Sequence, residues 1–558
     1  MSTRMTGAQA MVKCLELENI GVIFGYPGAA ICPFYDSLYS SHIRHILTRN
    51  EQNAGHAASG YARVTGKPSV CVATSGPGAT NLITAMATAY VDSIPLVVIT
   101  GQVSSDLLGR DVFQEVDITG AAEPFTKYSY LVKDAKDLPR VFKEAFYIAS
   151  TGRKGPVLID VPVDIQRQEI EFFYPKQVDI RGYKPTYKGH IMQVKRVAQA
   201  IKNAKRPLLC IGGGVFAAGA QKAVRSFSEE FSIPVVSTLM GIGAMPTAHP
   251  LYFGMLGNNG KKYANQAVQE SDLLIIMGAR VGDRAVSRPA LLEHTTSIIH
   301  IDIDPAEIGK NLGTTIPLVG DVGQVLEQLT QQNPQGEYTQ WLAQLEEWRL
   351  QEQTKQKEEL FPREETKFIN PREFFNQLSF ALEEDAVFVS DVGQNQMWSA
   401  TSMVIKEGRF LTTGGMGTMG YALPAAIGAK LAAPDRQVIA SCGDGAFQMS
   451  MMELATVNQH QIPIKLIVMN NHCLGMVREV QTVSYHDRQI AVDLAGGPQI
   501  EKIAKAYDIP FLRLEDARKM EGAIKEFIAA DGSFLLECMV DPRETTVAEG
   551  EDVLGGRI

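Results

Sequence analysis

The 558-residue chain is poor in cysteine, with seven scattered cysteines and no Cys-x-x-Cys pair. This pattern argues against a disulfide framework and favours a reducing, cytoplasmic location. No apolar run reaches the roughly 18 residues that a membrane span requires, and the N-terminal stretch MSTRMTGAQAMVKC lacks the apolar core of a signal peptide. The net charge of −9 has the wrong sign for a nucleic-acid-binding protein. We therefore expect neither a membrane nor a nucleic-acid partner.

Hydrophobic residues make up 45% and charged residues 21% of the chain, as in ordinary globular proteins. Helix-like and strand-like segments alternate, which predicts an α/β fold of three doubly wound parallel-sheet domains. We place these domains at residues 1–165, 191–330 and 371–540, followed by a polar, acidic tail at 541–558 that either covers a site or stays mobile. Linkers are expected at 164–190 and 333–370. In the second linker, Trp341, Leu345 and Trp348 share the spacing of one helix face.

Short apolar runs mark the expected strands of the first two domains. They are Val22–Phe24, Val70–Thr74, Leu96–Thr100, Val157–Val161, Pro207–Ile211, Pro234–Thr238, Leu273–Met277 and Ile298–Ile303. The segment Gly7–Asn19 has the pattern of a helix. Several of these runs lead into glycine-rich turns, as expected where a strand enters a helix in this fold class.

The stretch from Gln437 to Asn471 carries the clearest chemistry. A strand-like run enters Gly443-Asp444-Gly445, a helix is expected at 447–458, and a second strand-like run ends at Asn471. In a parallel sheet both strand ends reach the same edge, where ligands usually bind. A carboxylate, an amide oxygen and a free helix N-terminus suit Mg²⁺ bridging a diphosphate. The plainer interpretation is a tight strand-to-helix turn followed by an unrelated polar turn.

A weak internal repeat links the two ends of the chain. Gly60-Tyr61-Ala62 precedes the turn at 75–78, and Gly420-Tyr421-Ala422 precedes the turn at 442–445. Both pairs follow the order helix, strand, glycine-rich turn. Two copies of one fold flanking a different middle domain suggest a cofactor that is held between the copies.

The Gly-Asp-Gly and Asn-Asn pair resembles the thiamine diphosphate (ThDP) motif of the decarboxylase and carboligase superfamily. Nearly the whole chain resembles the catalytic subunit of the acetohydroxyacid synthase (acetolactate synthase) family. The matching stretches are FGYPG (24–28), TSGPGATNL (74–82), AYVDSIPLVVITGQV (89–103), FQEVDITG (113–120), STGRKGPVLIDVP (150–162), TLMGIGAMP (238–246), HIDIDPAEIGKN (300–311), GGMGTMGYALPAAIGA (414–429) and GMVRE (475–479).

This resemblance implies a role for each of several residues around ThDP. Glu51 would activate the aminopyrimidine, because a carboxylic acid facing its ring nitrogen, best in an apolar pocket, favours the reactive tautomer. Asp444, Asn471 and the backbone carbonyl of Cys473 would bind Mg²⁺. Further cofactor-binding positions are implied at Gln394, Asn395, Gly417, Met419, Gly443, Gly445, Ala446 and Met476. In this set Gln394, Asn395, Gly445 and Ala446 would contact the diphosphate, Gly417 the pyrimidine, and Met419 would wedge under the cofactor.

The middle domain resembles the FAD-binding domain of the same family. The implied flavin contacts are Arg153, Gly212, Gly213, Gly214, Thr238, Leu239, Met240, Gly278, Arg280, Arg284, Asp302 and Asp321. The glycines after Ile211 would admit a diphosphate, and Arg280 and Arg284 would neutralise it. The chain departs from the family pattern at Gly282, where an acid is usual, and at Asn259, where a histidine is usual.

The resemblance also implies a substrate pocket and an assembly. Phe113 and Gln114 would line the pocket from a partner subunit, and Gly28 and Ala29 would form its wall. The family implies a homodimer or homotetramer, often joined by a small regulatory subunit. Val480 stands where biosynthetic members usually carry a tryptophan associated with 2-oxobutyrate, so we expect pyruvate to be the preferred second substrate.

The implied activity is acetolactate synthesis in branched-chain amino-acid biosynthesis: pyruvate is decarboxylated and the two-carbon unit is joined to a second 2-oxo acid. A pyruvate oxidase or a glyoxylate carboligase on the same scaffold is the nearest alternative, although Glu51 counts against the carboligase. A nicotinamide-dependent dehydrogenase fits poorly, because GGGVFAAG departs from the GxGxxG fingerprint. The GDG–NN pair would also be unexplained in such a dehydrogenase. A non-enzymatic flavin-binding or interaction protein, the least favoured alternative, would retain the fold without turnover.

Overall fold

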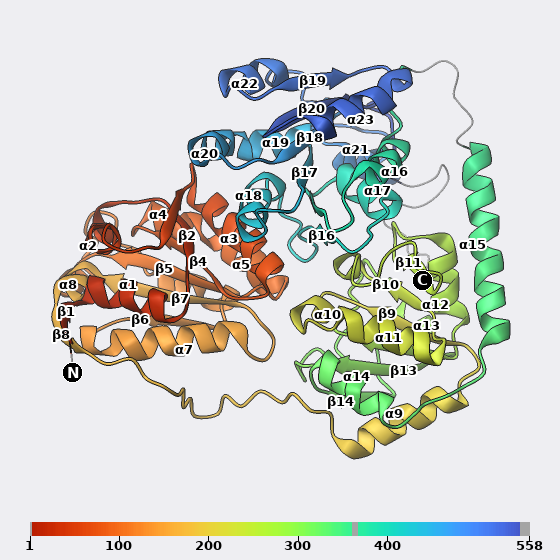
Figure 1. Ribbon diagram of the computed structural model, residues 1–558, viewed down its shortest axis with the longest axis horizontal. Helices are drawn as coiled ribbons and strands as arrows, with labels where there is room; N and C mark the ends of the chain where they lie inside the picture. The colour runs from red at the N-terminus through yellow and green to blue at the C-terminus, as the bar shows by residue number, and fades with distance from the viewer. Residues whose placement is uncertain (1–2, 360–366, 547–558) are drawn as a thin grey trace. The chain divides into compact units, whose positions relative to one another are not determined.

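The structure is a computed structural model that describes residues 3–359 and 367–546. It contains three six-stranded parallel sheets flanked by helices, which confirms the predicted fold class (Figure 1). Packing divides the chain into two compact units. Unit 1 comprises the described parts of Met1–Pro185, Thr413–Val438 and Met449–Ile464, and unit 2 those of Thr186–Thr412, Ile439–Gln448 and Lys465–Ile558.

Unit 1 is built on a sheet with the strand order β3-β2-β4-β5-β7-β6. Its strands are β2 Val22–Gly25, β3 Arg44–Leu47, β4 Ser69–Ala73, β5 Leu96–Gln102, β6 Tyr128–Leu131 and β7 Pro156–Pro162. Its helices are α1 Gly7–Leu17, α2 Cys32–Leu38, α3 Glu51–Thr65, α4 Pro77–Asn81, α5 Ile83–Val91, α6 Ile118–Ala122, α7 Leu138–Ser150, α8 Val163–Arg167, α18 Ala422–Ala432 and α20 Leu454–His460.

Both faces of the central strands in unit 1 are buried, which explains their continuous apolar runs. Val97 and Ile99 of β5 pack in a core with residues of α1, α2 and α7. Leu96 and Val98, whose side chains alternate with these along β5, are also fully buried. The helices α3 and α5 contact the sheet and each other. The strand β1 Thr3–Thr6 pairs antiparallel with β8 Glu169–Phe172, so the start of the predicted linker 164–190 is wrong: it forms α8 and β8.

The first sheet of unit 2 has the order β11-β10-β9-β12-β13-β14. Its strands are β9 Pro207–Ile211, β10 Val235–Ser237, β11 Tyr252–Met255, β12 Leu273–Met277, β13 Ser297–Asp302 and β14 Ile316–Val319. Its helices are α9 Ile191–Asn203, α10 Gly214–Ala217, α11 Gln221–Phe231, α12 Lys262–Glu270, α13 Pro289–Glu293, α14 Val322–Thr330 and α15 Thr339–Glu359. Trp341 and Leu345 are buried in one core of this sheet and Trp348 packs against it, so the predicted apolar helix face is correct.

The second sheet of unit 2 has the order β16-β15-β17-β18-β20-β19. Its strands are β15 Val387–Ser390, β16 Arg409–Leu411, β17 Val438–Gly443, β18 Lys465–Asn470, β19 Phe511–Leu514 and β20 Phe534–Met539. Its helices are α16 Pro371–Ala381, α17 Gln394–Ser402, α19 Asp444–Ser450, α21 Gly475–Ser484, α22 Ile500–Ala506 and α23 Met520–Ala529. The single helix predicted at 447–458 is wrong, because a 3-10 turn at Met451–Glu453 separates α19 from α20.

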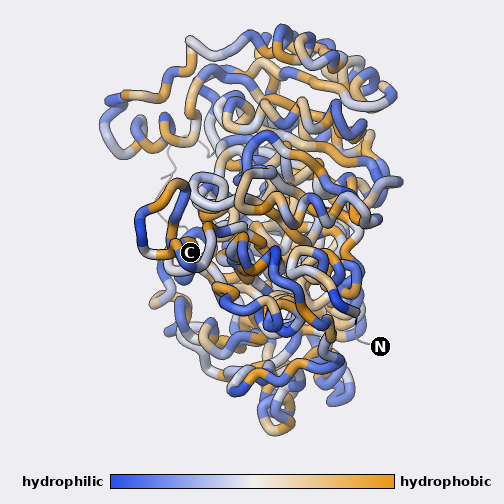
Figure 2. Tube along the Cα trace, turned by 90° about the vertical axis from the view of Figure 1, so that its left-hand side faces the viewer, coloured by the Kyte–Doolittle hydropathy of each residue, from blue (hydrophilic) through white to orange (hydrophobic). Residues whose placement is uncertain are grey.

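Hydrophobic segments along the chain are short and alternate with hydrophilic ones (Figure 2). This alternation matches the buried strands and their polar connections. In the part of the chain that the structure describes, no helix combines the length and the apolar character that crossing a membrane requires.

Candidate active site

The second sheet of unit 2 brings three polar turns to one edge. Gln394 follows β15, Asp444 follows β17 and Asn471 follows β18, and these three strands are neighbours in the sheet. Since α17 and α19 begin at the first two turns, their N-terminal backbone N–H groups lie at this edge, with Gly445 and Ala446 in the first turn of α19. The structure therefore places together the residues for which the sequence predicts a metal and diphosphate site.

The Asp444 carboxyl is buried at this edge. Burial raises its pKa to about 7, although backbone N–H groups of Gly445 and His472 oppose the shift by stabilising the ionised form. Burial removes the water that would stabilise the ionised carboxyl, and a bound divalent cation would stabilise it instead. The environment of Asp444 is therefore suited to a cation.

Asn471 and Cys473 add oxygen atoms to the same turn. The Oδ1 of Asn471 accepts the backbone N–H of Cys473 at 3.2 Å, and the carbonyl of Cys473 accepts the backbone N–H of Gly475 at 2.9 Å. A carboxylate, an amide oxygen and a carbonyl are the hard ligands that Mg²⁺ prefers. Among the described residues, no group of three or more His, Cys, Asp or Glu side chains forms an alternative metal site.

The orientation of Asn471 is fixed by Gln394. The Nδ2 of Asn471 donates to the Oε1 of Gln394 at 2.8 Å, and the Nε2 of Gln394 donates to the Oε1 of Glu479 and to the backbone carbonyl of Glu544. Gly475 makes this arrangement possible, because a Cβ at that position would overlap the Gln394 carboxamide. Steric exclusion by Gln394 thus explains why a glycine stands at the start of GMVRE.

Asn395 has its side chain committed to the protein. Its Nδ2 donates to the hydroxyl of Ser390 and the carbonyl of Ser441, and its Oδ1 accepts the hydroxyl of Ser441 at 2.6 Å. These bonds tie β15 to β17. The backbone N–H at the start of α17 is therefore the group through which Asn395 can meet a phosphate.

The described beginning of the tail packs against this site. The Glu544 carbonyl accepts the Nη2 of Arg478 at 2.8 Å, and the backbone N–H and hydroxyl of Thr546 donate to the two oxygens of Glu479, each at 2.8 Å. Sequence reasoning assigned no role to Arg478 or Glu479; both are buried in α21, which also carries the half-buried Met476 and Val480. Residues 547–558, to which the predicted covering or mobile role also applies, lie outside the described residues.

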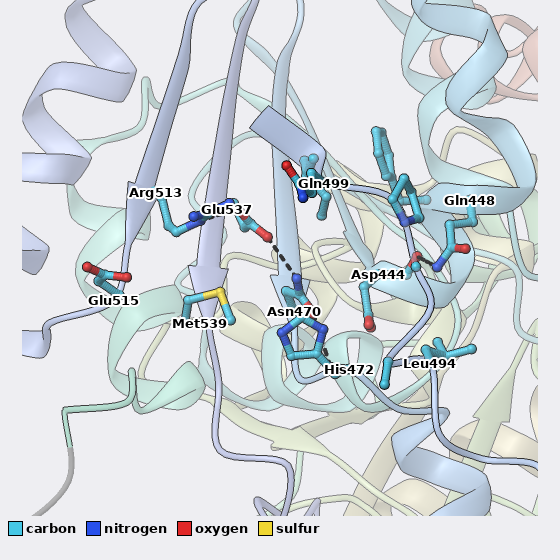
Figure 3. A pocket seen from close by; sticks show the side chains of 15 residues that line it. Asp444, Gln448, Asn470, His472, Leu494, Gln499, Arg513, Glu515, Glu537 and Met539 are labelled. Carbon is cyan, nitrogen blue, oxygen red and sulfur yellow. Dashed lines mark hydrogen bonds and ion pairs between the residues drawn. The ribbon is translucent and has the colours of Figure 1, made fainter. Parts of the chain in front are cut away.

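A pocket of about 370 Å³ adjoins Asp444 on the side of β18, β20 and β19 (Figure 3). Apolar walls come from Phe447, Leu494, Pro498 and Ile500. Arg513, Glu537 and Asn470 form a hydrogen-bonded series across it. No sequence motif pointed to Arg513 or Glu537.

Unit 1 presents Glu51 at the carboxyl edge of its own sheet. Glu51 is the first residue of α3, which Asn50 caps by accepting the backbone N–H of Gln52 at 2.8 Å. The half-buried Glu51 carboxyl accepts the Nδ2 of Asn81 at 2.9 Å. The short helix α4, which follows β4, supplies both Asn81 and Gly78, where a Cβ would lie 3.4 Å from the Glu51 Oε1.

The buried carboxyl of Glu453 binds residues on both sides of the start of α3. Glu453 is fully buried and accepts the backbone N–H of Arg49 and the Nδ2 of Asn53, both at 2.9 Å, together with the hydroxyl of Thr456 at 2.6 Å. Burial raises the pKa of Glu453. No local sequence pattern predicts this contact, because 400 residues separate Glu453 from Asn53.

The other predicted pocket residues of unit 1 lie at the same edge, Phe113 and Gln114 on a loop and Gly28 and Ala29 at the start of a 3-10 turn. The backbone N–H of Ala30, next to Ala29, donates to the hydroxyl of Thr74 at 3.3 Å, and Gly28 packs against the Thr74 side chain. Gln114 has a left-handed backbone, with φ +61°, and packs beside Gly76. Phe113 is 87% exposed.

Gly417 and Met419 belong to the segment of unit 1 that precedes α18. Gly417 is exposed with φ +64°, and Met419 is half-buried. Between them, the hydroxyl of Thr418 shares a hydrogen bond of 2.8 Å with that of Thr88. This bond anchors the segment to α5.

Most of the predicted flavin residues lie at one edge of the first sheet of unit 2. Five parallel strands of this sheet end beside or within them: β9 before Gly212–Gly214, β10 before Thr238–Met240, β12 before Gly278 and Arg280, β13 at Asp302 and β14 before Asp321. A Cβ on Gly212 would meet Ala279, whereas one on Gly213 would meet only Met240 at 3.4 Å or more.

The charged members of this predicted flavin site differ in exposure. Arg280 is half-buried, whereas the Arg284 side chain is 69% exposed. Asp302 accepts the backbone N–H of Asp304, and Asp321 caps α14. Arg153 lies in unit 1, where its Nε donates to the hydroxyl of Ser93 at 3.0 Å.

Comparison with known proteins identifies all three domains. The chain matches the thiamine pyrophosphate enzyme N-terminal TPP-binding domain at residues 5–121, the central domain at 194–329 and the C-terminal TPP-binding domain at 391–538. It is 44% identical to a probable acetolactate synthase large subunit of Methanocaldococcus jannaschii, over 97% of this chain and 93% of the relative. It is 46% identical to the acetolactate synthase large subunit of Corynebacterium glutamicum, over 87% and 78%, and 42% identical to the acetolactate synthase of Arthrospira platensis, over 98% and 97%. The chain therefore belongs to the acetolactate synthase large-subunit family of ThDP-dependent enzymes.

Proposed function

We propose that the protein is the catalytic subunit of an acetolactate synthase of branched-chain amino-acid biosynthesis. It decarboxylates pyruvate and joins the two-carbon unit to a second 2-oxo acid, with pyruvate preferred over 2-oxobutyrate as the acceptor. The observation that carries this proposal is the arrangement of Asp444, Asn471 and Gln394 at one sheet edge, in a chain that matches its relatives over nearly its full length.

Mg²⁺ and the diphosphate of ThDP would bind at this edge. Asp444, the Asn471 Oδ1 and the Cys473 carbonyl would hold the cation, while backbone N–H groups of Gly445, Ala446 and the start of α17 would face the phosphate oxygens. When bound, ThDP supplies the nucleophilic carbon that attacks the oxo group of the substrate. The protein residues bind and orient the cofactor.

Glu51 would hold and move a proton at the ring nitrogen of the bound aminopyrimidine. The hydrogen bond from Asn81 fixes one of its carboxyl oxygens, which leaves the other free to face a ligand. Gly417 and Met419 would contact and shape the same cofactor. In the proposed assembly, Phe113 and Gln114 would border the substrate from a partner subunit, and Gly28, Ala29 and Val480 are the other proposed pocket residues.

We also propose that FAD binds in unit 2. The glycine turns after β9 and β12 and the half-buried Arg280 support this assignment, because bare backbone and an arginine suit a diphosphate. The flavin would be structural, since the proposed reaction has no net redox change.

The assembly that we propose is a homodimer or homotetramer with a small regulatory subunit, located in the cytoplasm. The relatives named as large subunits support the regulatory partner. All seven cysteines are free, which fits a reducing compartment.

The test incubates the purified protein with Mg²⁺, ThDP and FAD, omitting each in turn. Pyruvate alone is supplied first, and then pyruvate with 2-oxobutyrate, and products are quantified. ThDP-dependent formation of 2-acetolactate is the expected result. Acetate formed with flavin reduction would instead identify a pyruvate oxidase. A separate incubation with glyoxylate tests the other alternative, because tartronate semialdehyde as its product would identify a glyoxylate carboligase.

A further inference from the structure

A hydrogen-bonded chain of side chains runs from β19 to the turn after β18 (Figure 3). The Nε of Arg513 donates to the Oε2 of Glu537 at 2.7 Å, and the Nδ2 of Asn470 donates to the Oε1 of Glu537 at 2.7 Å. The Oδ1 of Asn470 then accepts the backbone N–H of His472 at 3.0 Å. This series of hydrogen bonds therefore ends at the turn that carries Asn471 and Cys473.

Glu537 lies in β20 and is 2% exposed. Burying a carboxylate costs folding free energy. Apolar side chains of similar volume often stabilise a protein interior as well as a buried ion pair does, or better. Both oxygens of Glu537 are occupied, one by each neighbour. Its position is therefore better explained by orienting those neighbours than by joining strands.

The turn after β18 requires support because its backbone is unusual. His472 has φ +55°, a left-handed conformation that residues with a Cβ rarely adopt. Its carbonyl accepts the N–H of Leu494 at 2.9 Å, and His472 lines the same pocket as Asp444. The Asn470 side chain thus fixes the residue that lies between Asn471 and Cys473, the other two proposed cation ligands.

We propose that Arg513, Glu537 and Asn470 are positioning residues for the divalent cation. They hold the His472 peptide, and with it Asn471 and Cys473, in register with Asp444. Arg513 and Glu537 act through Asn470 and do not touch the cation. This inference rests on the proposed function, which supplies the cation.

The decisive measurement is Mn²⁺ affinity in the presence of excess ThDP, read from the electron paramagnetic resonance signal of free aqueous Mn²⁺. Glu537→Gln keeps the shape of the side chain but turns one acceptor into a donor that faces another donor. We expect its Mn²⁺ dissociation constant to rise about tenfold, as when a partner of a metal ligand is altered in other sites. Arg513→Met should weaken binding less, and Arg513→Lys should restore part of the loss.

Leu536→Val is the matched control for general destabilisation. Leu536 is the fully buried neighbour of Glu537 in β20, and its side chain points to the opposite face of the sheet. The control should lower the thermal midpoint while leaving Mn²⁺ affinity unchanged. Excess Mg²⁺ should restore the turnover of Glu537→Gln, because it compensates for weaker cation binding. If Leu536→Val loses turnover, excess Mg²⁺ should not restore it.

The outcomes separate this inference from the proposed function. Glu537→Gln with wild-type Mn²⁺ affinity, or with a loss that Leu536→Val matches, would overturn the positioning role while the wild-type enzyme still bound the cation with ThDP. A wild-type protein that bound no Mn²⁺ with ThDP would overturn both.

Discussion

The side-chain amide of Asn471 donates to the Oε1 of Gln394 at 2.8 Å, joining the turn after β18 to the start of α17. This bond passes through space that Gly475 leaves empty. Gln394 also binds Glu479 and the carbonyl of Glu544. One carboxamide therefore links the proposed cation ligand, the helix α21 and the described start of the tail.

Gly475→Ala should disrupt this link. The added methyl group would overlap the Gln394 carboxamide, so Gln394 must move and release Asn471. We expect ThDP affinity in the presence of Mg²⁺ to fall about tenfold or more, measured by isothermal titration calorimetry. Gly522→Ala in α23 is the control, since outside its own helix backbone and chain neighbours the added Cβ would meet no described atom within 4 Å. Equal ThDP affinities in the two variants would contradict this explanation of Gly475.

Glu51→Gln should lower turnover while leaving cofactor binding nearly intact. The amide keeps the volume and can still accept the hydrogen bond from Asn81, but it cannot exchange a proton with a bound aminopyrimidine. We expect kcat to fall about 10²- to 10⁴-fold, the usual contribution of a positioned acid or base, with acetolactate formation as the assay. A variant with wild-type kcat would remove Glu51 from the proposed mechanism.

The sequence predicted the strands with continuous apolar runs most accurately. Pro207–Ile211 and Leu273–Met277 are strands over those residues, because burial on both faces requires apolar side chains throughout. Edge strands such as β3 and β19 were missed, since they are short and contain exposed polar residues. The break between α19 and α20 was also missed, because helical periodicity does not show that the end of this stretch packs with unit 1.

Within the site, local motifs identified Asp444 and Asn471 but not the residues that support them. Glu453 contacts Asn53, and Gln394 contacts Asn471, across sequence separations of 400 and 77 residues. No local pattern encodes such pairs. The supporting acids Glu453, Glu479 and Glu537 are all buried, whereas a glutamate considered on sequence alone is expected at the surface.

Val480→Trp should change the choice of the second substrate. Val480 is half-buried on α21, and a larger apolar side chain there would contact the additional methyl group of 2-oxobutyrate. Such a contact discriminates by about 10- to 200-fold at most, so the ratio of 2-aceto-2-hydroxybutyrate to 2-acetolactate should rise within that range when both substrates compete. Val480→Ala serves as the control and should not raise the ratio. An unchanged ratio in Val480→Trp would show that this position does not contact the acceptor.

Asp160→Asn should change the pH dependence of stability. The buried Asp160 carboxyl accepts the hydroxyl of Thr100 at 2.7 Å and the Nε2 of Gln102 at 3.0 Å, and burial raises its pKa from 3.8 to about 7. Between these values the folded chain holds a proton that the unfolded chain has released, so stability falls as pH rises, by at most about 1.4 kcal/mol per pH unit. Asparagine resembles the protonated acid, so the stability of Asp160→Asn relative to wild type should increase from pH 4 to pH 7, measured by urea unfolding. Asp106→Asn, which removes the same charge from an exposed turn, is the control and should leave the pH dependence of stability unchanged. If the stability of the wild type and of Asp160→Asn changed in parallel with pH, Asp160 would be ionised throughout this range.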